Sequence, residues 1–393
     1  MIPSAMRWAA ASSRLESPSA AAEDVARQLR LQLGEGPWDL VLGFVSGTGA
    51  QRTTTAAQAL RAECPATTFA AVSARGVVTF EHEIEHGVGL SVFAARLPGV
   101  RIEPFVMTAD AWADPVDGPE AFDRLAPGLR GAEVVLMFGD PFTLDPDRVL
   151  GLVDRWAPGV RIAGGLASAG LRPGGNTVVL NDWVAHEGGF AIALSGAIRA
   201  DVVVSQGCDP IGPLLEVTAV EEHLLLELDG QPALERLEQV LLALPAAERD
   251  RLRQGLYIGR SARPEAEGRG DFLIRNILGA DRTRGAIAVA ATLKRGERIR
   301  LHVRDARAAE DDLGMLLAPQ AFDRPASAAL MFSCNGRGRG LYGVPDRDVA
   351  LLRSALPGAA PVAGMFCAGE LGPVGERNHL HGHTASIVVL RPR

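Results

Sequence analysis

The sequence predicts an α/β protein of two domains, with mixed β-sheets flanked by helices and built from repeated strand-loop-helix-strand-hairpin units. Three observations carry this prediction: an apolar run ending in Phe occurs three times, each run precedes a polar loop and a helix-like segment, and each copy then returns through a cluster of small residues. The 44 Gly and 25 Pro among 393 residues also favour many short strands and turns over a helical bundle.

The first strand and the helix of each copy are visible in the residue pattern. The apolar runs are LVLGF at 40–44, VVLMF at 134–138 and AALMF at 328–332. They have the composition of buried strands. The helix-like segments are 54–63, 146–156 and 345–356. Pro146 and Pro345 open the second and third segments, and proline suits the first position of a helix.

The second half of each copy consists of a small-residue strand, a polar hairpin and a last apolar strand. The small-residue clusters are FAAVSARG at 69–76, IAGGLASAG at 162–170 and VAGMFCAG at 362–369, and the last strands are 88–94, 189–195 and 385–390. A strand-helix-strand crossover is expected to be parallel and the following hairpin antiparallel, so each sheet should be mixed. The shared order of elements indicates internal duplication.

The remaining segments fit around these copies. We expect a flexible N-terminal segment plus a helix over 1–37, a first domain over 38–200 and a second over 201–393. Residues 233–253 predict one helix or a pair broken near Pro245. Residues 208–213, CDPIGP, are interpreted as a rigid turn, and 286–293 with 298–303 as a hairpin.

Charge, cysteines and hydropathy exclude several classes of protein. With 40 basic and 47 acidic residues the net charge is −7, which argues against a nucleic-acid partner. The four cysteines form no CxxC pair, so zinc-ribbon and thioredoxin interpretations fail. No apolar stretch is long enough to span a membrane, and residues 1–22 lack the apolar core of a secretory signal. These features predict a cytoplasmic protein with no membrane partner.

The loop after the third apolar run is the leading candidate site. It reads Cys334, Asn335, Gly336, Arg337 and Gly338, followed by a second arginine and glycine. Alternating glycines let backbone N–H groups converge on an anion, and arginines add charge and donors. The loop is therefore either a ligand pocket for a carboxylate or phosphate, or a solvated connection. A thiolate at Cys334 would be favoured beside the arginines.

Other polar clusters admit both functional and structural interpretations. Asp140 ends a buried strand, where its carboxylate caps the following turn or, less favoured, faces a ligand amine. His82 and His86 flank Glu83 and Glu85, a pattern that suggests metal, but a hairpin with a solvated acidic face is favoured there. His379, His381 and His383 alternate along an extended segment, and we expect one of them to pack rather than all three to bind metal.

Several motifs, taken together and in order, resemble the FIST family. They include AVSARGVVTFEHEIEHG, MFGDPF, QGCDPIGP, LDGQPALERL, GDFLIRNILG, MFSCNGRG, FCAGELGPVG and LHGHTASIVVL. The resemblance covers nearly the whole chain after about Trp38, as FIST-N followed by FIST-C. It implies an intracellular sensory module that binds a small ligand such as an amino acid. It adds Glu370, Asn378 and His381 to the ligand-binding candidates in the third copy.

The resemblance leaves alternatives open. Some family members are described as haem-binding nitric-oxide sensors, so haem is a possible cofactor, and Cys64-Pro65 resembles a haem-regulatory dipeptide. A protein-interaction scaffold, like the substrate-receptor part of F-box relatives, is a third possibility. An enzyme using Cys334 as nucleophile and His381 as base is the fourth. We favour a non-enzymatic sensor that signals through a partner protein and uses no catalytic residue and no metal.

Overall fold

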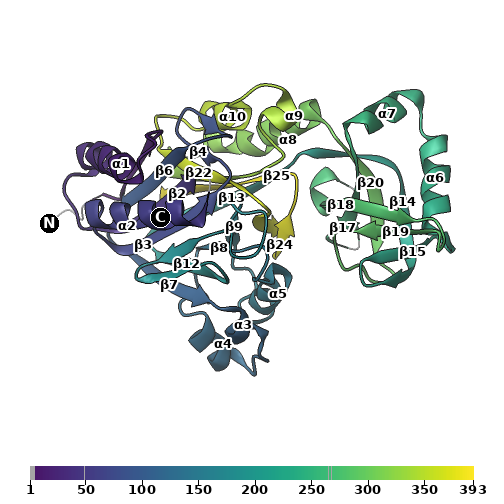
Figure 1. The fold of residues 1–393 in the computed structure, drawn as a ribbon, viewed down its shortest axis with the longest axis horizontal. Coiled ribbons are helices and arrows are strands. Elements are labelled where there is room, and N and C mark those ends of the chain that lie inside the picture. Colours follow the sequence, from purple (N-terminus) through teal and green to yellow (C-terminus); the bar gives the residue numbers. More distant parts are fainter. Residues whose placement is uncertain (1–4, 48, 264, 267) are drawn as a thin grey trace. The chain divides into compact units, whose positions relative to one another are not determined.

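The chain folds into two compact units. The computed structural model describes residues 5–47, 49–263, 265, 266 and 268–393. The first unit contains the chain up to Val204, residues 313–380 and 384–393, and the second contains 205–312 with 381–383 (Figure 1). The second unit is thus an insertion in the sequence of the first. The predicted division at residues 200 and 201 concerns the limits of the family's two domains and stays a prediction.

The first unit contains the three predicted copies. In each copy the first two strands pair in parallel, with a helix between them along the chain. These elements are β2 (Trp38–Ser46), α2 (Ala50–Glu63), β3 (Ala66–Ala74), β8 (Val134–Gly139), α5 (Pro146–Trp156), β9 (Ile162–Leu166), β21 (Ala328–Cys334), α10 (Arg347–Ala355) and β22 (Val362–Cys367). The predicted bounds of α5 are confirmed, whereas α2 begins earlier and α10 begins after Pro345.

Each copy is completed as a mixed sheet, as predicted. Its last strand lies antiparallel beside its first strand. The last strands are β6 (Gly89–Arg96), β12 (Gly189–Gly196) and β25 (Thr384–Pro392), and the strands outside them are β1 (Arg7–Ser13), β7 (Val100–Met107) and β13 (Ile198–Gln206).

The hairpin of each copy pairs with the sheet of a different copy. The hairpin β4 (Val77–Val78) and β5 (Glu83–Ile84) extends the third sheet beside β22. The hairpin β10 (Val178–Leu180) and β11 (Trp183–Ala185) extends the first sheet beside β3. The hairpin β23 (Glu370–Val374) and β24 (Arg377–His381) extends the second sheet beside β9. This cyclic exchange binds the copies into one unit, and the sequence pattern did not reveal it.

The three copies meet through equivalent phenylalanines. Phe44, Phe138 and Phe332 are fully buried, and their ring centroids lie 5.4–6.1 Å apart. Aromatic pairs at this separation stabilise a core beyond the apolar area that they bury. Since each Phe lies near the end of its strand, the three strand ends are held close to the same centre.

Helices cover the outer faces of the sheets. Ser17 caps α1 (Pro18–Leu33), because its side chain accepts from the Ala20 N–H at 3.4 Å. The helices α1 and α2 pack on the first sheet. The helices on the second sheet are α3 (Ala109–Ala113), α4 (Pro119–Leu125) and α5, and those on the third are α8 (Ala306–Leu317) and α10. The short helical segments are α9 (Arg339–Tyr342), η1 (Leu252–Gln254), η2 (Arg269–Asp271) and η3 (Ala318–Phe322).

The second unit is a closed antiparallel barrel with one short added strand (Figure 1). Its strands, in sheet order, are β14 (Cys208–Glu221), β20 (Arg298–Arg304), β17 (Leu256–Ser261), β18 (Phe272–Asp281), β19 (Ala286–Val289), β15 (Leu224–Leu228) and β16 (Gln231–Pro232). β14 also pairs with β15, which closes the barrel. The helices α6 (Ala233–Ala243) and α7 (Ala246–Arg251) confirm the predicted pair broken near Pro245.

Two expectations for the second unit are wrong. Residues 208–213 belong to β14 rather than to a turn, because a register shift between Ile211 and Leu214 places Pro213 in a bulge, with Gly212 at a φ of 61°. β19 and β20 are not a hairpin, because β19 pairs with β18 and β15 while β20 pairs with β14 and β17. Apolar alternation predicts strands but does not identify their partners. In the described residues, no helix is long and apolar enough to cross a membrane.

Candidate functional site

The end of β21 brings together several of the predicted residues. Cys334, half-buried, lies in register with Cys367 on the neighbouring strand β22. The Asn335 N–H donates to the Cys367 carbonyl at 3.0 Å, and the Arg337 N–H donates to the Cys334 carbonyl at 2.8 Å. The predicted loop is therefore held by its own backbone at the end of the strand rather than solvated along its length.

Arg337 is committed to a partner inside the protein. Its guanidinium, 1% exposed, donates to both oxygens of Asp348 at 2.6 and 2.7 Å and to the Tyr342 hydroxyl at 2.7 Å. Burial alone would lower the pKa of Arg337, but the adjacent Asp348 carboxylate outweighs burial and raises it. This bidentate pair fixes the loop to the first turn of α10. The anion-binding role predicted for Arg337 stays a prediction.

Glu370 lies beside Cys334 and is fully buried. Its Oε2 accepts from the Thr384 N–H at 3.2 Å and from the Thr384 hydroxyl at 2.8 Å, and the Cys334 thiol also donates to this carboxyl. Burial raises the pKa of Glu370 to about 8. Cys334 and Glu370, two of the ligand-binding candidates, are therefore in direct contact, and their role in binding stays a prediction.

Asn378 and His381 lie elsewhere. Asn378 joins β24 to the second sheet: its Oδ1 accepts from the Ile162 N–H at 2.8 Å and its Nδ2 donates to the Val160 carbonyl at 2.8 Å. His381 is buried at the end of β24 and groups with the second unit, where the His383 ring packs at a tilt against the Tyr257 ring. The structure does not place Asn378 with the Cys334 loop.

A polar cavity of about 240 Å³ lies between the β4–β5 hairpin and the segment that continues the Cys334 loop. Its lining carries both signs of charge, positive from two arginines and negative from glutamates and an aspartate. The lining residues are Arg14, His82, Glu83, Ile84, Glu85, His86, Arg339, Pro345 and Asp346. Such a cavity suits a small molecule that bears both an anionic and a cationic group.

Glu83 is the buried acid of this cavity. Its side chain is 5% exposed, its Oε1 accepts from the Val349 N–H of α10 at 3.0 Å, and its Oε2 has no hydrogen-bond partner among the described residues. Burial, followed by the nearby Asp348 carboxylate, raises the pKa of Glu83 to about 8. The expectation of a solvated acidic face is therefore wrong for Glu83, because the hairpin packs against the third sheet and α10.

Two other carboxylates fix the walls of the cavity. Both oxygens of Glu85 accept from the Arg339 N–H at 3.0 Å, an approach that requires glycine at 338, since a Cβ there would lie 2.6 Å from the Glu85 carboxyl carbon. Asp346 accepts from the Glu83 N–H at 2.6 Å and lies 3.2 Å from His82 Nδ1. Because Asp346 adopts a left-handed φ of 65°, its side chain is held at the start of α10 by local backbone geometry.

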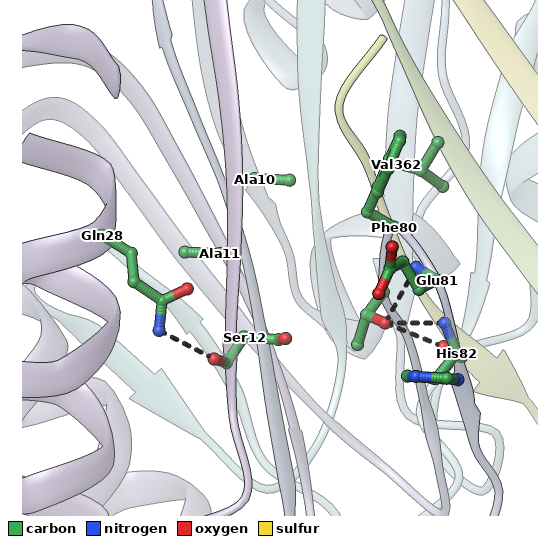
Figure 2. A pocket seen from close by; sticks show the side chains of 9 residues that line it. Ala10, Ala11, Ser12, Gln28, Phe80, Glu81, His82 and Val362 are labelled. Atoms are coloured by element: carbon green, nitrogen blue, oxygen red, sulfur yellow. Dashed lines mark hydrogen bonds between the residues drawn. The ribbon is translucent and has the colours of Figure 1, made fainter. Parts of the chain in front are cut away.

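A second cavity of about 210 Å³ adjoins the same hairpin (Figure 2). Figure 2 shows Ser12 and Gln28 on one side and the Phe80–His82 segment on the other, with the Gln28 amide donating to the Ser12 carbonyl at 3.1 Å. His82 also lines the cavity of about 240 Å³ and therefore contributes to the lining of both cavities.

Haem and metal fit these residues poorly. The two cavities described above, both lined by His82, have volumes of only about 210 and 240 Å³, whereas haem is a large, flat and mostly apolar group held by an axial ligand. Cys64, the other haem candidate, is fully buried, and burial raises its pKa to about 12. In the described part of the chain, no group of three His, Cys, Asp or Glu could hold a metal ion.

The sequence pattern points to the loop but not to the cavity beside it. The sequence pattern offers a metal site at 82–86 only as the less favoured interpretation, and it gives no role to Asp346 or Arg14. The signal that was available is the density of charge in the hairpin of the first copy. What no pattern showed is that this hairpin crosses to the third copy, which brings residues more than 250 positions apart together.

Comparisons with known proteins agree with the resemblance in the sequence. Residues 39–231 match the FIST N domain and residues 233–373 match the FIST C domain. An uncharacterized protein of Mycobacterium tuberculosis is 33% identical over 373 residues, covering 94% of this chain and 95% of the relative. An uncharacterized protein of Mycobacterium bovis is 36% identical over 321 residues, covering 80% and 81%.

Among solved structures, a cyanuric acid hydrolase from A. caulinodans aligns with a TM-score of 0.35 and 10% identity, covering 99% of each chain. FIST domains are small-ligand sensory domains. On the two domain matches and the long alignments with the mycobacterial proteins, the chain belongs to the FIST family.

Proposed function

We propose that this protein is a non-enzymatic sensor whose ligand, an amino acid or a small molecule of similar charge, binds in the cavity between the β4–β5 hairpin and the 339–346 segment. The observation that carries the proposal is the presence of both signs of charge around a volume of about 240 Å³, next to a buried acid with an unpartnered oxygen among the described residues. Arg339 and Arg14 would meet a carboxylate, and the acidic side chains would meet an ammonium group.

A sensing role is supported by where the cavity lies in the fold. Its walls come from the hairpin of the first copy and from the loop and helix start of the third copy. A ligand that contacts both walls would stabilise the packing of the hairpin on the third sheet. Any change in that packing can be read by a partner protein, which we propose as the route of signal output.

A non-enzymatic role is supported by the chemistry of the lining. None of its nine residues carries a hydroxyl or thiol nucleophile. The thiol of Cys334 and the carboxyl of Glu370 are engaged with each other outside the lining. The arrangement can bind and orient a polar molecule but offers no hydroxyl or thiol group to attack it.

The proposal is tested by measuring binding to the wild-type protein and two arginine variants. Calorimetric titration with the protein amino acids should identify at least one that binds wild type and binds Arg339→Gln about tenfold more weakly. Arg347→Gln is the matched control, because this exposed arginine is close in sequence but does not line the cavity. No binding to wild type, or equal weakening in both variants, would overturn the proposal.

A further inference from the structure

The two carboxylate oxygens of Glu83 differ in their hydrogen bonding. Oε1 accepts a hydrogen bond from the first turn of α10, and Oε2 has no partner among the described residues although the side chain is only 5% exposed. A buried charged oxygen without a partner costs free energy, so a protein retains one where a ligand or a proton completes it. Glu83 also lines the cavity described above.

The other acidic residues of the lining are already engaged. Both oxygens of Glu85 accept the Arg339 N–H. The two oxygens of Asp346 contact the Glu83 N–H and the His82 ring. Among the described lining carboxylates, Glu83 alone has an oxygen without a hydrogen bond, and this oxygen can accept one from a ligand.

The charges around Glu83 favour a cation there. Arg337 lowers the pKa of Glu83 by its charge, but its guanidinium is bonded in bidentate fashion to Asp348, which is itself a like charge to Glu83. When Glu83 is ionised, the buried cluster therefore holds two carboxylates for one guanidinium. An added positive charge in the cavity would balance it.

We infer that Glu83 binds the ammonium group of the ligand, and that the cavity therefore selects molecules with an amine over equally sized carboxylates. This inference rests on the proposed function, since it assigns one contact within the same cavity. Glu83 would act as the specificity-determining residue, while Arg339 and Arg14 would hold the opposite end of the ligand.

Protonation of Glu83 should oppose the binding of an amine. The groups that face Glu83 are Asp348 and the Val349 N–H on α10, Arg337 and Tyr342 from the loop and α9, and Glu85, His82 and Asp346 around the cavity. With its pKa raised to about 8, Glu83 holds a proton below that pH, and an ammonium group must displace it. Affinity for an amine should therefore fall progressively as the pH is lowered below about 8.

The experiment compares wild type, Glu83→Gln and Glu81→Gln by calorimetric titration. The titrants are the protein amino acids, their des-amino carboxylates and their decarboxylated amines. Glu81→Gln is the matched control, because it changes an exposed glutamate of the same hairpin that does not line the cavity. The amide oxygen at 83 can still accept the Val349 N–H, so the fold of the variant should be retained.

We expect wild type to bind an amino acid at least about tenfold more tightly than its des-amino counterpart. Glu83→Gln should lose this discrimination and the pH dependence, and Glu81→Gln should keep both. A wild type that binds the carboxylate as well as the amino acid overturns the inference without any variant, as does a Glu83→Gln protein that retains full discrimination. A wild type that binds no amino acid contradicts the proposed function itself, which separates the two failures.

Discussion

The second and third copies of the repeat place different chemistry at the same position of the fold. Asp140 and Cys334 each lie two residues after the central phenylalanine: Asp140 directly follows β8, and Cys334 is the last residue of β21. Asp140 is fully buried and fully bonded: one oxygen accepts from Asn176 Nδ2 at 2.9 Å, and the other from the Phe142 N–H and the Thr143 hydroxyl. The structural role favoured for Asp140 from its sequence position agrees with these bonds.

The third copy is arranged differently around its strand end. Cys334 is half-buried, and its neighbour Glu370 has a pKa raised to about 8 by burial. On the hairpin that docks beside this copy, Glu83 retains an oxygen without a partner among the described residues. One fold position thus holds a carboxylate that closes a turn in the second copy and, in the third copy, a thiol that donates to the buried carboxyl of Glu370. This difference indicates that a functional site is better sought at buried polar groups whose hydrogen bonds are incomplete than at positions where the repeat is most regular.

The largest expected effect is a difference in stability between variants in α10 of the third copy and in α5 of the second. Asp348→Asn should destabilise the protein by about 3–5 kcal/mol, because it leaves the Arg337 guanidinium buried without its counter-charge. Asp147→Asn, the same change in the exposed first turn of α5, should cost about 0.5 kcal/mol or less. Urea unfolding of both variants measures the difference, and equal losses would mean that the buried pair does not distinguish the third copy.

A pH-dependent effect is expected from Glu370. Burial raises its pKa to about 8 in the folded protein, from 4.5 for an exposed glutamate, so the folded protein binds a proton that the unfolded chain releases between these values. This contribution to stability is complete below about pH 4.5 and is lost as the pH rises through about 8.

Glu370→Gln should remove this contribution and flatten the decline, making the variant more stable than wild type above pH 8 by an amount on the order of a few kcal/mol. Thermal unfolding measured across pH checks this difference in stability. The control is Glu376→Gln, which changes an exposed glutamate of the same hairpin. Parallel pH profiles for wild type and Glu370→Gln would contradict this account of the third copy.

A smaller effect is expected in the second copy. Asp140→Asn disturbs either the oxygen that accepts two bonds or the one that accepts the Asn176 amide, so it should cost about 1–3 kcal/mol. Ligand affinity, measured by the titrations described above, should be unchanged because Asp140 does not line the cavity. A loss of affinity in a folded Asp140→Asn protein would place the second copy in the site as well.

The smallest effect concerns the cysteines. Cys334 is half-buried, whereas Cys64, Cys208 and Cys367 are buried, and burial raises the pKa of Cys367 and Cys64. A maleimide should therefore label Cys334 first in the native protein and the other three only after unfolding. Peptide mass spectrometry locates the label. Early modification of Cys367 would show that the end of β22 in the third copy opens more than the structure indicates.

Much of the fold could be predicted from the sequence because each copy repeats a local pattern. Apolar runs of about five residues, loops and helix starts identified β2, β8 and β21 with their helices. The exchange of hairpins could not be predicted, because the pairing of β4 with β22 joins residues that no local pattern connects. For the same reason the β14 bulge and the partners of β19 and β20 were misassigned.

The site was predicted only in part, for a related physical cause. Cys334 and Glu370 follow strands of one copy, so their proximity follows from the repeat and from family resemblance. Glu83 belongs to another copy, and its burial depends on where the hairpin docks. Residue type alone suggested solvent for Glu83, since an acidic side chain is usually exposed.

The most direct test of the account is hydrogen–deuterium exchange with and without an amino acid that binds. We predict slower exchange in peptides covering 76–88 and 334–348, the two walls of the cavity, and no change in 139–144 and 176–188, which surround Asp140. Protection confined to the second copy, or spread equally over both strand ends, would contradict the assignment of ligand binding to the hairpin of the first copy and the loop of the third.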